Sequence, residues 1–213
     1  MKDLYPVFLH LNKKKVLIVG GGSIATQKIR SLLQTGCEII VVSPHITQEI
    51  QTWLQEKNVN LRMREFLPTD VNDIDLVFTA TNDSRINVLV KMIANEKNIL
   101  VNAVDDPPHC DFFVPSIVRR GSLVVAISTQ GECPGFAKLL RKKLETMIPS
   151  SYGDFLAFLG RLRKKVKTHC KEFQERQSVM KDILYDGILE DLENKTLNEV
   201  QDKVENCIST RLR

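Results

Sequence analysis

A glycine-rich turn near the N-terminus restricts what this chain can fold into more than any other stretch. A short apolar run, Val16–Val19, ends in three consecutive glycines and passes directly into a helical pattern that stops at Gly36. The spacing Gly20-x-Gly22-x-x-Ala25 is the dinucleotide fingerprint with alanine at its third small position. In this pattern the first glycine permits a tight turn and the second lets the backbone approach a pyrophosphate, while the third small residue lets the helix pack closely on the strand. The turn therefore predicts a nucleotide site at the start of a helix.

From residue 14 to about 105 the sequence alternates between short apolar runs and helical patterns. Continuous apolar runs such as Leu76–Phe78 are typical of a parallel sheet that is covered on both faces. The expected strands are 14–20, 38–43, 60–66, 74–80 and 99–104, and the expected helices are 24–35, 46–57 and 84–96. Strands that alternate with helices in this way predict an α/β fold, a Rossmann-type doubly wound parallel sheet.

The carboxyl ends of these strands are where a ligand should bind, because doubly wound sheets hold their ligands in the crevice beyond them. The second strand ends in Ser43-Pro44, without the usual acidic residue for the ribose hydroxyls, and the Ser43 hydroxyl can bind a ribose without repelling a phosphate. No arginine is adjacent to hold a 2′-phosphate, so the sequence favours NAD over NADP. The predicted cofactor-binding residues are Gly20, Gly22, Ser23, Ile24, Ser43, Pro44, Thr81, Asn82 and Asn102.

The second half of the chain follows a different pattern. The apolar segments Phe112–Val118 and Ser122–Thr129 flank a glycine-containing turn and predict a β-hairpin, and Phe136–Met147 predicts a helix. From Tyr152 onward, apolar residues at helical spacing predict a small bundle of two or three helices. The predicted parts are a Rossmann domain at 1–112, a hairpin-plus-helix segment at 113–150 and a helical domain at 151–213.

Composition excludes several classes of protein. The five cysteines are scattered and form no CxxC pair, which indicates a reducing compartment and argues against a disulfide framework or a zinc knuckle, so no metal site is expected. No apolar run approaches the ~20 residues of a membrane span, and the N-terminus lacks a signal-peptide pattern, so we expect a cytoplasmic protein without a membrane partner.

Residues 116–150 carry six Lys and Arg against two Glu, but not the interleaved aromatic residues of a nucleic-acid platform. An anionic small ligand is therefore expected, and no nucleic acid.

Six short blocks in the same order resemble a known family. The blocks are Val-Gly-Gly-Gly-x-x-Ala (19–25), Val-Ser-Pro (42–44), Ala-Thr-Asn-Asp (80–83), Asn-Ala-Val-Asp-Asp (102–106), Phe-x-x-Pro-Ser (112–116) and Ala-Ile-Ser-Thr-x-Gly-x-x-Pro (126–134), followed by a basic helix. Together they resemble the precorrin-2 dehydrogenase / sirohydrochlorin ferrochelatase family of sirohaem biosynthesis, which includes the N-terminal module of sirohaem synthase. The resemblance is dense over residues 1–150 and looser over the helical tail.

The resemblance implies a homodimer that oxidises the tetrapyrrole precorrin-2 to sirohydrochlorin with NAD, and it makes the segment 113–150 the dimerisation segment. The important aspartate of the family falls on Asp105. A carboxylate at the cofactor edge can receive the proton that leaves with the hydride, and we expect His109 to assist it. The expected substrate-binding residues, which would face the carboxylates of the macrocycle, are Arg119, Arg120, Arg141 and Ser128.

One residue departs from the pattern of the family, and two alternative functions remain open. Cys133 stands where the family often carries a serine, which bears on regulation through that hydroxyl and not on the dehydrogenase chemistry. The first alternative is a bifunctional enzyme that also inserts ferrous iron into sirohydrochlorin, since chelation here needs no recognisable set of metal ligands. The second is an NAD-sensing regulatory module, for which the chain shows no recognition-helix pattern.

Overall fold

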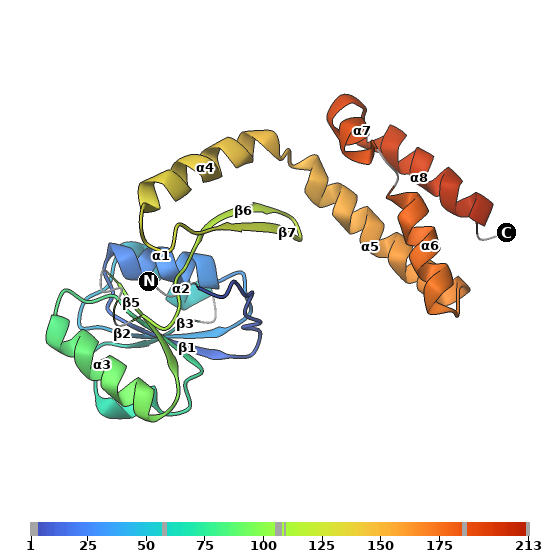
Figure 1. Ribbon diagram of the computed structural model, residues 1–213. Helices are drawn as coiled ribbons and strands as arrows, with labels where there is room; N and C mark the ends of the chain where they lie inside the picture. The colour runs from blue at the N-terminus through green and yellow to red at the C-terminus, as the bar shows by residue number, and fades with distance from the viewer. Residues whose placement is uncertain (1–3, 57–58, 105–107, 109, 185–186, 212–213) are drawn as a thin grey trace. The chain divides into compact units, whose positions relative to one another are not determined.

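The chain divides into two compact units, Met1–Val114 and Pro115–Arg213. The computed structural model (Figure 1) describes residues 4–56, 59–104, 108, 110–184 and 187–211. The first unit alternates strands and helices, whereas the second combines a β-hairpin with helices. The two units therefore differ in architecture as well as in sequence pattern.

The first unit is a five-stranded parallel sheet in the order β3-β2-β1-β4-β5. Its elements are β1 (Lys15–Val19), α1 (Ser23–Leu32), β2 (Glu38–Val42), α2 (Gln48–Glu56), β3 (Val59–Arg62), the 3₁₀ turn η1 (Pro68–Val71), β4 (Leu76–Thr79), α3 (Ser84–Glu96) and β5 (Leu100–Ala103). The chain order reverses between β1 and β4, where such sheets bind ligands. The predicted doubly wound α/β fold is thus confirmed.

Both faces of this sheet are buried, which explains the continuous apolar runs of its strands. Alternate residues such as Val16 and Ile18 pack on the face covered by α1 and α2, while Leu17 and Val19 pack on the face with α3. Figure 1 shows these helices on opposite sides of the sheet. The tight strand–helix contact expected at Ala25 is present, since its side chain is fully buried in the first of these two cores.

Two predicted boundaries are wrong for reasons that lie outside the local pattern. Strand β3 ends at Arg62 and not at 66, because the Arg64 N–H turns back to donate to the Arg62 carbonyl at 2.8 Å. The first strand of the hairpin begins at residue 116 and not at 112. Phe112 instead belongs to the first unit, where its ring meets Phe78 edge-on with centroids 5.4 Å apart.

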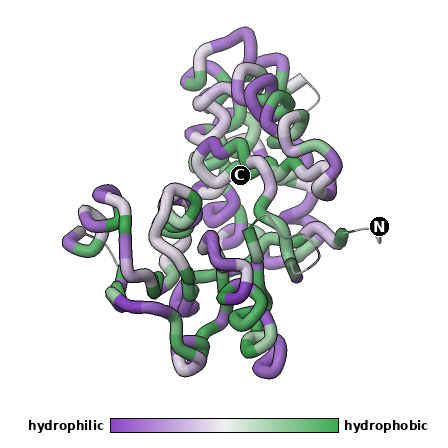
Figure 2. The backbone as a smooth tube through the Cα atoms, turned by 90° about the vertical axis from the view of Figure 1, so that its left-hand side faces the viewer, coloured by the Kyte–Doolittle hydropathy of each residue, from purple (hydrophilic) through white to green (hydrophobic). Residues whose placement is uncertain are grey.

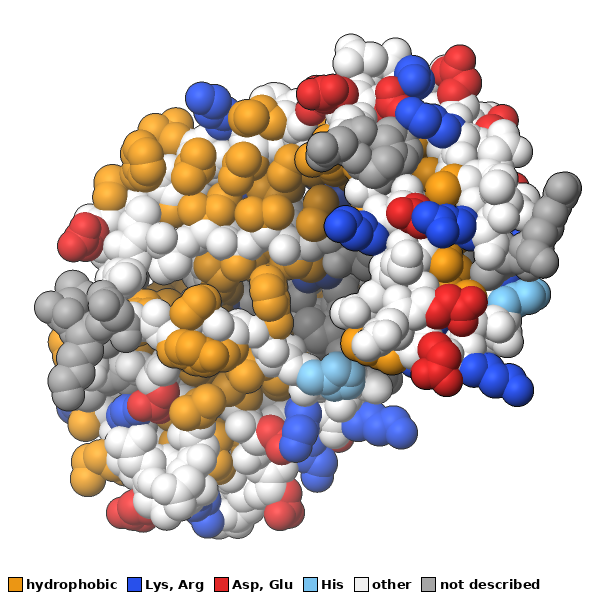
Figure 3. Space-filling model, turned by 45° about the vertical axis from the view of Figure 1, so that its right-hand side comes forward, with side chains coloured by type: hydrophobic (Ala, Val, Ile, Leu, Met, Phe, Trp, Pro, Cys, Tyr) orange, Lys and Arg blue, Asp and Glu red, His pale blue; other side chains and the backbone are white. Residues whose placement is uncertain are grey.

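The second unit begins with the predicted hairpin, formed by β6 (Ser116–Arg120) and β7 (Leu123–Ile127), and continues into α4 (Pro134–Met147). Val118, Ile127 and Ala137 form a small core between the hairpin and α4. Several large apolar side chains of α4 are exposed, including Leu139 at 65%. Hydrophobic side chains are also visible on the surface in Figure 3.

The remainder of the second unit is a bundle of four described helices, where the sequence predicted two or three. These are α5 (Ser151–His169), α6 (Phe173–Ile183), α7 (Ile188–Asn194) and α8 (Leu197–Arg211). Hydrophobic and hydrophilic residues alternate along them in Figure 2, and the apolar ones form one core. The start of α8 had a sequence signal that was missed: Thr196 and Glu199 form a capping pair, in which the Thr196 N–H donates to Glu199 Oε2 at 2.8 Å.

A buried carboxylate holds the turn that follows β3. Asp70 is 1% exposed and accepts hydrogen bonds from both Nη atoms of Arg64, at 2.7 and 2.6 Å, and from the Leu67 N–H at 2.8 Å. Arg62 also donates to it. Burial alone raises the pKa of Asp70, but these hydrogen bonds together outweigh burial and lower the pKa to about 2.

We therefore expect Asp70→Asn to lower the free energy of unfolding at pH 7 by about 2 kcal/mol. Because the pKa of Asp70 is lower in the folded chain than in the unfolded one, this stabilisation is present above about pH 4 and is lost as the pH falls toward 2. Urea unfolding of both proteins between pH 7 and about pH 3 measures the difference, which should shrink on acidification.

The matched control is Asp75→Asn, which changes an exposed carboxylate that pairs with Lys14 at 2.8 Å and accepts from the Lys15 N–H at 2.8 Å. Exposed pairs of this kind contribute less than about 1 kcal/mol. A loss for Asp70→Asn that did not change with pH would contradict the electrostatic explanation.

Candidate functional site

A cleft of about 570 Å³ opens at the carboxyl ends of β1, β2 and β4. It thus lies at the switch point of the sheet, as expected for this fold. Its walls come from the ends of these strands, from the turn after β3 and from the start of α3. The residues lining it are Val19, Gly20, Val42, Ser43, Pro44, Glu65, Phe66, Thr81, Asp83, Arg85 and Ile86.

Gly20 of the glycine turn lines this cleft, and the three glycines of the turn have different surroundings. Gly20 has a φ of +116°, and a Cβ there would lie 2.3 Å from the Ala80 carbonyl oxygen. A Cβ on Gly21 would lie 2.1 Å from the His45 carbonyl oxygen. A Cβ on Gly22, by contrast, would meet no protein atom within 4 Å. The first two glycines are therefore required by the fold, whereas the third leaves open space in front of the helix.

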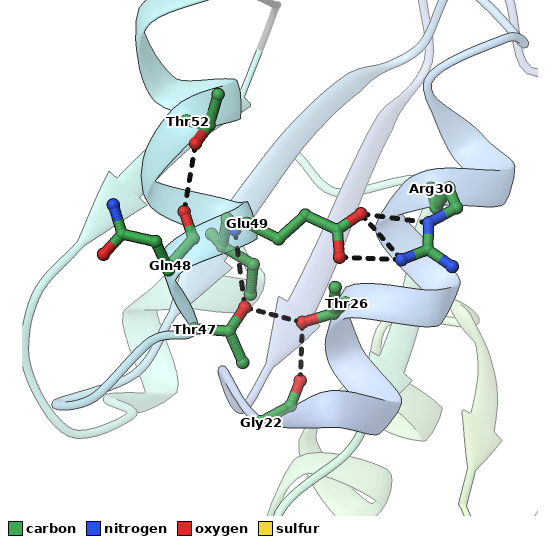
Figure 4. Close-up of polar contacts among 8 residues, drawn as sticks. Gly22, Thr26, Arg30, Thr47, Gln48, Glu49 and Thr52 are labelled. Carbon is green, nitrogen blue, oxygen red and sulfur yellow. Dashed lines mark hydrogen bonds and ion pairs between the residues drawn. The ribbon is translucent and has the colours of Figure 1, made fainter.

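The start of α1 fits a pyrophosphate. The N-cap residue is Gly22, which supplies no side chain to the first N–H groups, and no acidic residue occurs in the first turn. These N–H groups and the positive end of the helix dipole are the groups that bind phosphate in this fold. Two hydrogen bonds of Thr26 fix the turn. Its Oγ1 donates to the Gly22 carbonyl at 2.9 Å and shares a hydrogen bond with Thr47 Oγ1 at 2.8 Å (Figure 4).

Ser43 and Pro44 line the cleft, but the Ser43 hydroxyl is engaged within its own loop. Ser43 is 6% exposed, and its Oγ donates to the His45 carbonyl at 2.6 Å. The proton that was expected to reach a ribose is therefore used to hold the chain after β2. Pro44 is exposed and presents its ring to the cleft.

At the end of β4, polar side chains mainly shape the start of α3. Thr81 Oγ1 donates to Asn87 Oδ1 at 2.8 Å and accepts from the Asp83 N–H at 3.2 Å. Asp83 is the N-cap of α3, accepting from the Arg85 N–H at 2.9 Å, and pairs with the Arg85 guanidinium at 3.0 Å. The hydrogen bonds from Arg85 lower the pKa of Asp83. The two charged side chains on this wall of the cleft, Asp83 and Arg85, therefore pair with each other.

The predicted catalytic residues Asp105 and His109 lie outside the described residues, but residues on either side of them are hydrogen-bonded to the sheet. The Val104 N–H donates to the Thr79 carbonyl at 3.0 Å. At the other end the Cys110 thiol accepts from the Ala103 N–H at 3.2 Å and donates to the Ala103 carbonyl at 3.0 Å. The chain therefore leaves β5 and returns to it within a few residues.

Asp111 and Asn102 complete this attachment. The Asp111 carboxylate accepts from the Val101 N–H at 2.8 Å and pairs with Lys91 at 2.5 Å. Asn102 is 6% exposed, and its amide donates to the Phe112 carbonyl at 2.9 Å. The structure thus gives Asn102 a role in holding the loop and does not place it among the residues lining the cleft.

The predicted cofactor residues therefore separate into two groups. Gly20, Ser43, Pro44 and Thr81 line the cleft, whereas Gly22, Ser23, Ile24, Asn82 and Asn102 are not among its lining residues. Prediction from the sequence missed Glu65 and Phe66, because it extended the strand through them. It also missed Asp83 and Arg85, although an aspartate before an α-helical pattern is an N-cap signal.

The predicted substrate-binding residues lie in the second unit and have different surroundings. Arg120 donates to three carbonyls, those of Ile148 at 2.7 Å, Glu145 at 2.7 Å and Arg119 at 3.0 Å. Two of these carbonyls belong to the end of α4, which Arg120 therefore caps. Arg141 pairs with Glu145 one turn along α4. Arg119 and Ser128 are exposed.

Two further findings concern metals and membranes. Among the described residues, no group of three or more His, Cys, Asp or Glu side chains could hold a metal ion. None of the helices in the described part of the chain is long and apolar enough to cross a membrane.

The fold, the glycine turn and the cleft define a Rossmann-type dinucleotide-binding protein. The family model described as "Putative NAD(P)-binding" matches residues 7–116, and the one described as "Sirohaem synthase dimerisation region" matches residues 151–208. Siroheme synthase 1 of Yersinia enterocolitica is 41% identical over 175 residues, which are 82% of this chain and 37% of that protein. Siroheme synthase 2 of the same organism is 34% identical over 211 residues, which are 99% of this chain and 45% of that protein.

A solved structure named "SirC, precorrin-2 dehydrogenase" superposes with a TM-score of 0.79 at 28% identity, covering 95% of this chain and 100% of that one. The chain belongs to the precorrin-2 dehydrogenase / sirohydrochlorin ferrochelatase family, as the sequence motifs predicted. It spans about two fifths of the length of the curated relatives it matches. The dimerisation region of the family model falls on 151–208, whereas the sequence prediction assigned dimerisation to 113–150.

The contrast between Gly20 and Gly22 gives a paired prediction. We expect Gly20→Ala to lower the free energy of unfolding by about 2 kcal/mol or more, because the backbone is left-handed there and the Cβ meets the Ala80 carbonyl. Gly22→Ala should unfold like the unmodified chain but bind NAD about tenfold or more weakly, because its methyl group projects into the open space before α1. Urea unfolding and calorimetric titration with NAD measure the two effects. Equal loss of stability in both variants would contradict this assignment.

Arg119 and Arg120 give a second pair of variants that should differ in stability. Arg120→Ala removes charge-assisted hydrogen bonds to the end of α4, and we expect the free energy of unfolding to fall by about 2 kcal/mol. Arg119→Ala removes an adjacent exposed charge and should change it by less than about 0.5 kcal/mol. Thermal and urea unfolding of the full chain distinguish them. If Arg120→Ala were as stable as Arg119→Ala, the capping role of Arg120 would be wrong.

Proposed function

We propose that this chain oxidises precorrin-2 to sirohydrochlorin, with NAD as the hydride acceptor. The observation that carries the proposal is the match to a structure named precorrin-2 dehydrogenase over the full length of that chain. The dinucleotide cleft and the NAD(P)-binding family model support a nicotinamide cofactor. The cofactor takes up the hydride when bound, and the chain must position the substrate and accept a proton.

Asp105 is the proposed acid–base group. It follows directly after Val104, whose N–H is bonded to the end of β4, and β4 is one of the strands that form the cleft. A carboxylate next to the cleft can accept the proton released as the substrate loses a hydride. His109 follows four residues later in the sequence and is proposed to assist it. The attachment of Cys110 and Asp111 to β5 supports the proposal, because a catalytic group must be held in place by its surroundings.

The substrate and the assembly are also part of the proposal. Precorrin-2 bears many carboxylates, and an exposed arginine such as Arg119 suits them better than Arg120, whose guanidinium is occupied by carbonyls. Arg141 and Ser128 remain proposed contacts. A homodimer acting in the cytoplasm is proposed from the matched dimerisation region and the sirohaem synthase relatives.

The test is anaerobic incubation of the protein with precorrin-2 and NAD, following the absorbance of reduced nicotinamide. We expect Asp105→Asn to reduce turnover about 100-fold or more, because positioned general acid–base groups contribute by this order. Binding of NAD, measured by calorimetric titration, should be unchanged.

The matched control is Asp106→Asn, which makes the same chemical change one residue further along the loop and should retain most of the activity. If Asp105→Asn turned over like Asp106→Asn, the assignment of the acid–base group would be wrong. If the unmodified chain bound NAD but reduced none in the presence of precorrin-2, the proposed reaction itself would be wrong.

A further inference from the structure

The wall of the cleft next to β2 is formed by a segment that comes from β3. Val42 and Arg62, the last residues of β2 and β3, are partners in the parallel register, and the Ser43 N–H donates to the Arg62 carbonyl at 3.3 Å. The chain that leaves β3 therefore runs beside the end of β2. Glu65 and Phe66 of this segment line the cleft together with Ser43 and Pro44. In this fold, the adenosine ribose of a dinucleotide lies at the end of β2.

The backbone on both sides of Glu65 is fixed. Arg64 is held through its guanidinium by the buried carboxylate of Asp70, at 2.6 and 2.7 Å, and also donates to the Glu65 carbonyl at 2.9 Å. Phe66 is 8% exposed and packs in the core beneath the sheet, and the next N–H, that of Leu67, donates to Asp70 at 2.8 Å. Glu65 itself is exposed at the cleft. Glu65 thus lines the cleft from a segment that is anchored before and after it.

The other described charged side chains in and next to the cleft are paired with each other or with Asp70. Three charged side chains line the cleft, and two of them, Asp83 and Arg85, pair with each other at 3.0 Å on the wall formed by α3. The two arginines nearest to Glu65 in sequence, Arg62 and Arg64, are both paired with Asp70. Arg62 and Arg64 are therefore already engaged, whereas the acidic residue Glu65 lines the cleft.

We infer that Glu65 determines the choice between NAD and NADP. Its carboxylate supplies, from the segment after β3, the acidic group that Rossmann proteins usually carry at the end of β2 and that is missing there. It accepts hydrogen bonds from the ribose hydroxyls of NAD and repels the 2′-phosphate of NADP, since like charges placed against each other weaken binding strongly. The inference rests on the proposed nicotinamide cofactor and adds the residue that selects it.

The experiment measures the dissociation constants of NAD and of NADP by calorimetric titration of the full chain, without a tetrapyrrole, in about 0.1 M salt. The unmodified chain should bind NAD about tenfold or more tightly than NADP. Glu65→Gln should bring the two constants within about threefold of each other, chiefly by strengthening NADP binding, and Glu65→Arg should favour NADP. Thermal unfolding checks that the variants remain folded.

The matched control is Glu96→Gln, which makes the same change in charge at the far end of α3. Glu96 is eleven residues beyond Arg85 on that helix, about 16 Å along its axis, which exceeds the ~10 Å screening length at this salt concentration. It should leave the ratio of the two constants unchanged. A ratio for Glu65→Gln equal to that of Glu96→Gln would overturn the inference, as would an unmodified chain that binds NADP as tightly as NAD. Both results leave the proposed reaction untouched, because neither depends on precorrin-2 turnover. A chain that bound neither cofactor would overturn the proposed NAD-dependent reaction together with the inference.

Discussion

Direct backbone-on-backbone packing at the glycine turn is the constraint on which the rest of the first unit depends. The Gly20 N–H bonds to the Val42 carbonyl at 2.9 Å, and the Cα of Gly20 faces the Ala80 carbonyl with no room for a methyl group. At this point the ends of β1, β2 and β4 therefore contact one another through main-chain atoms. Because no side chain occupies this point, a ligand can approach the first turn of α1 directly. The same packing thus fixes the order of the strands around the switch point and leaves the space for the phosphates.

The elements of this unit could be predicted because their signals are local. A strand that is buried on both faces must be apolar throughout, and Val16–Val19 shows this without reference to any other part of the chain. The wrong boundaries depend on distant partners. Strand β3 stops where the Arg64 N–H turns back to the Arg62 carbonyl, and Asp70, eight residues after Arg62, holds both arginines. Phe112 does not join the hairpin because it packs on Phe78. In the bundle, the start of α8 is set by the Thr196–Glu199 cap, which apolar periodicity does not detect.

The site was predictable in part for the same reason. The fingerprint places Gly20 at the cleft because its function and its backbone conformation are specified by one short motif. Ser43, Thr81 and Asn102 occupy strand ends as predicted, but the sequence does not reveal that their polar atoms are already bonded to neighbouring loops. Glu65 could not be found by inspecting the end of β2, because it reaches that place from the next strand. Asp105 and His109 remain predictions, outside the described residues.

A common physical reason connects these outcomes. Polar side chains at the ends of buried strands must be hydrogen-bonded, and in a loop-rich edge the nearest partners are other loops. Ser43, Asn102 and the Cys110 thiol are therefore used to hold the loops in place, which reduces the ordering that a ligand would have to impose on binding. The groups at the cleft that remain for recognition are then the first N–H groups of α1 and the exposed residue Glu65. At such an edge, the buried polar residues hold the loops of the site, and the exposed ones are available to contact a ligand. The sequence alone does not reveal which residue belongs to which group, because this depends on which loops lie next to each other in the fold.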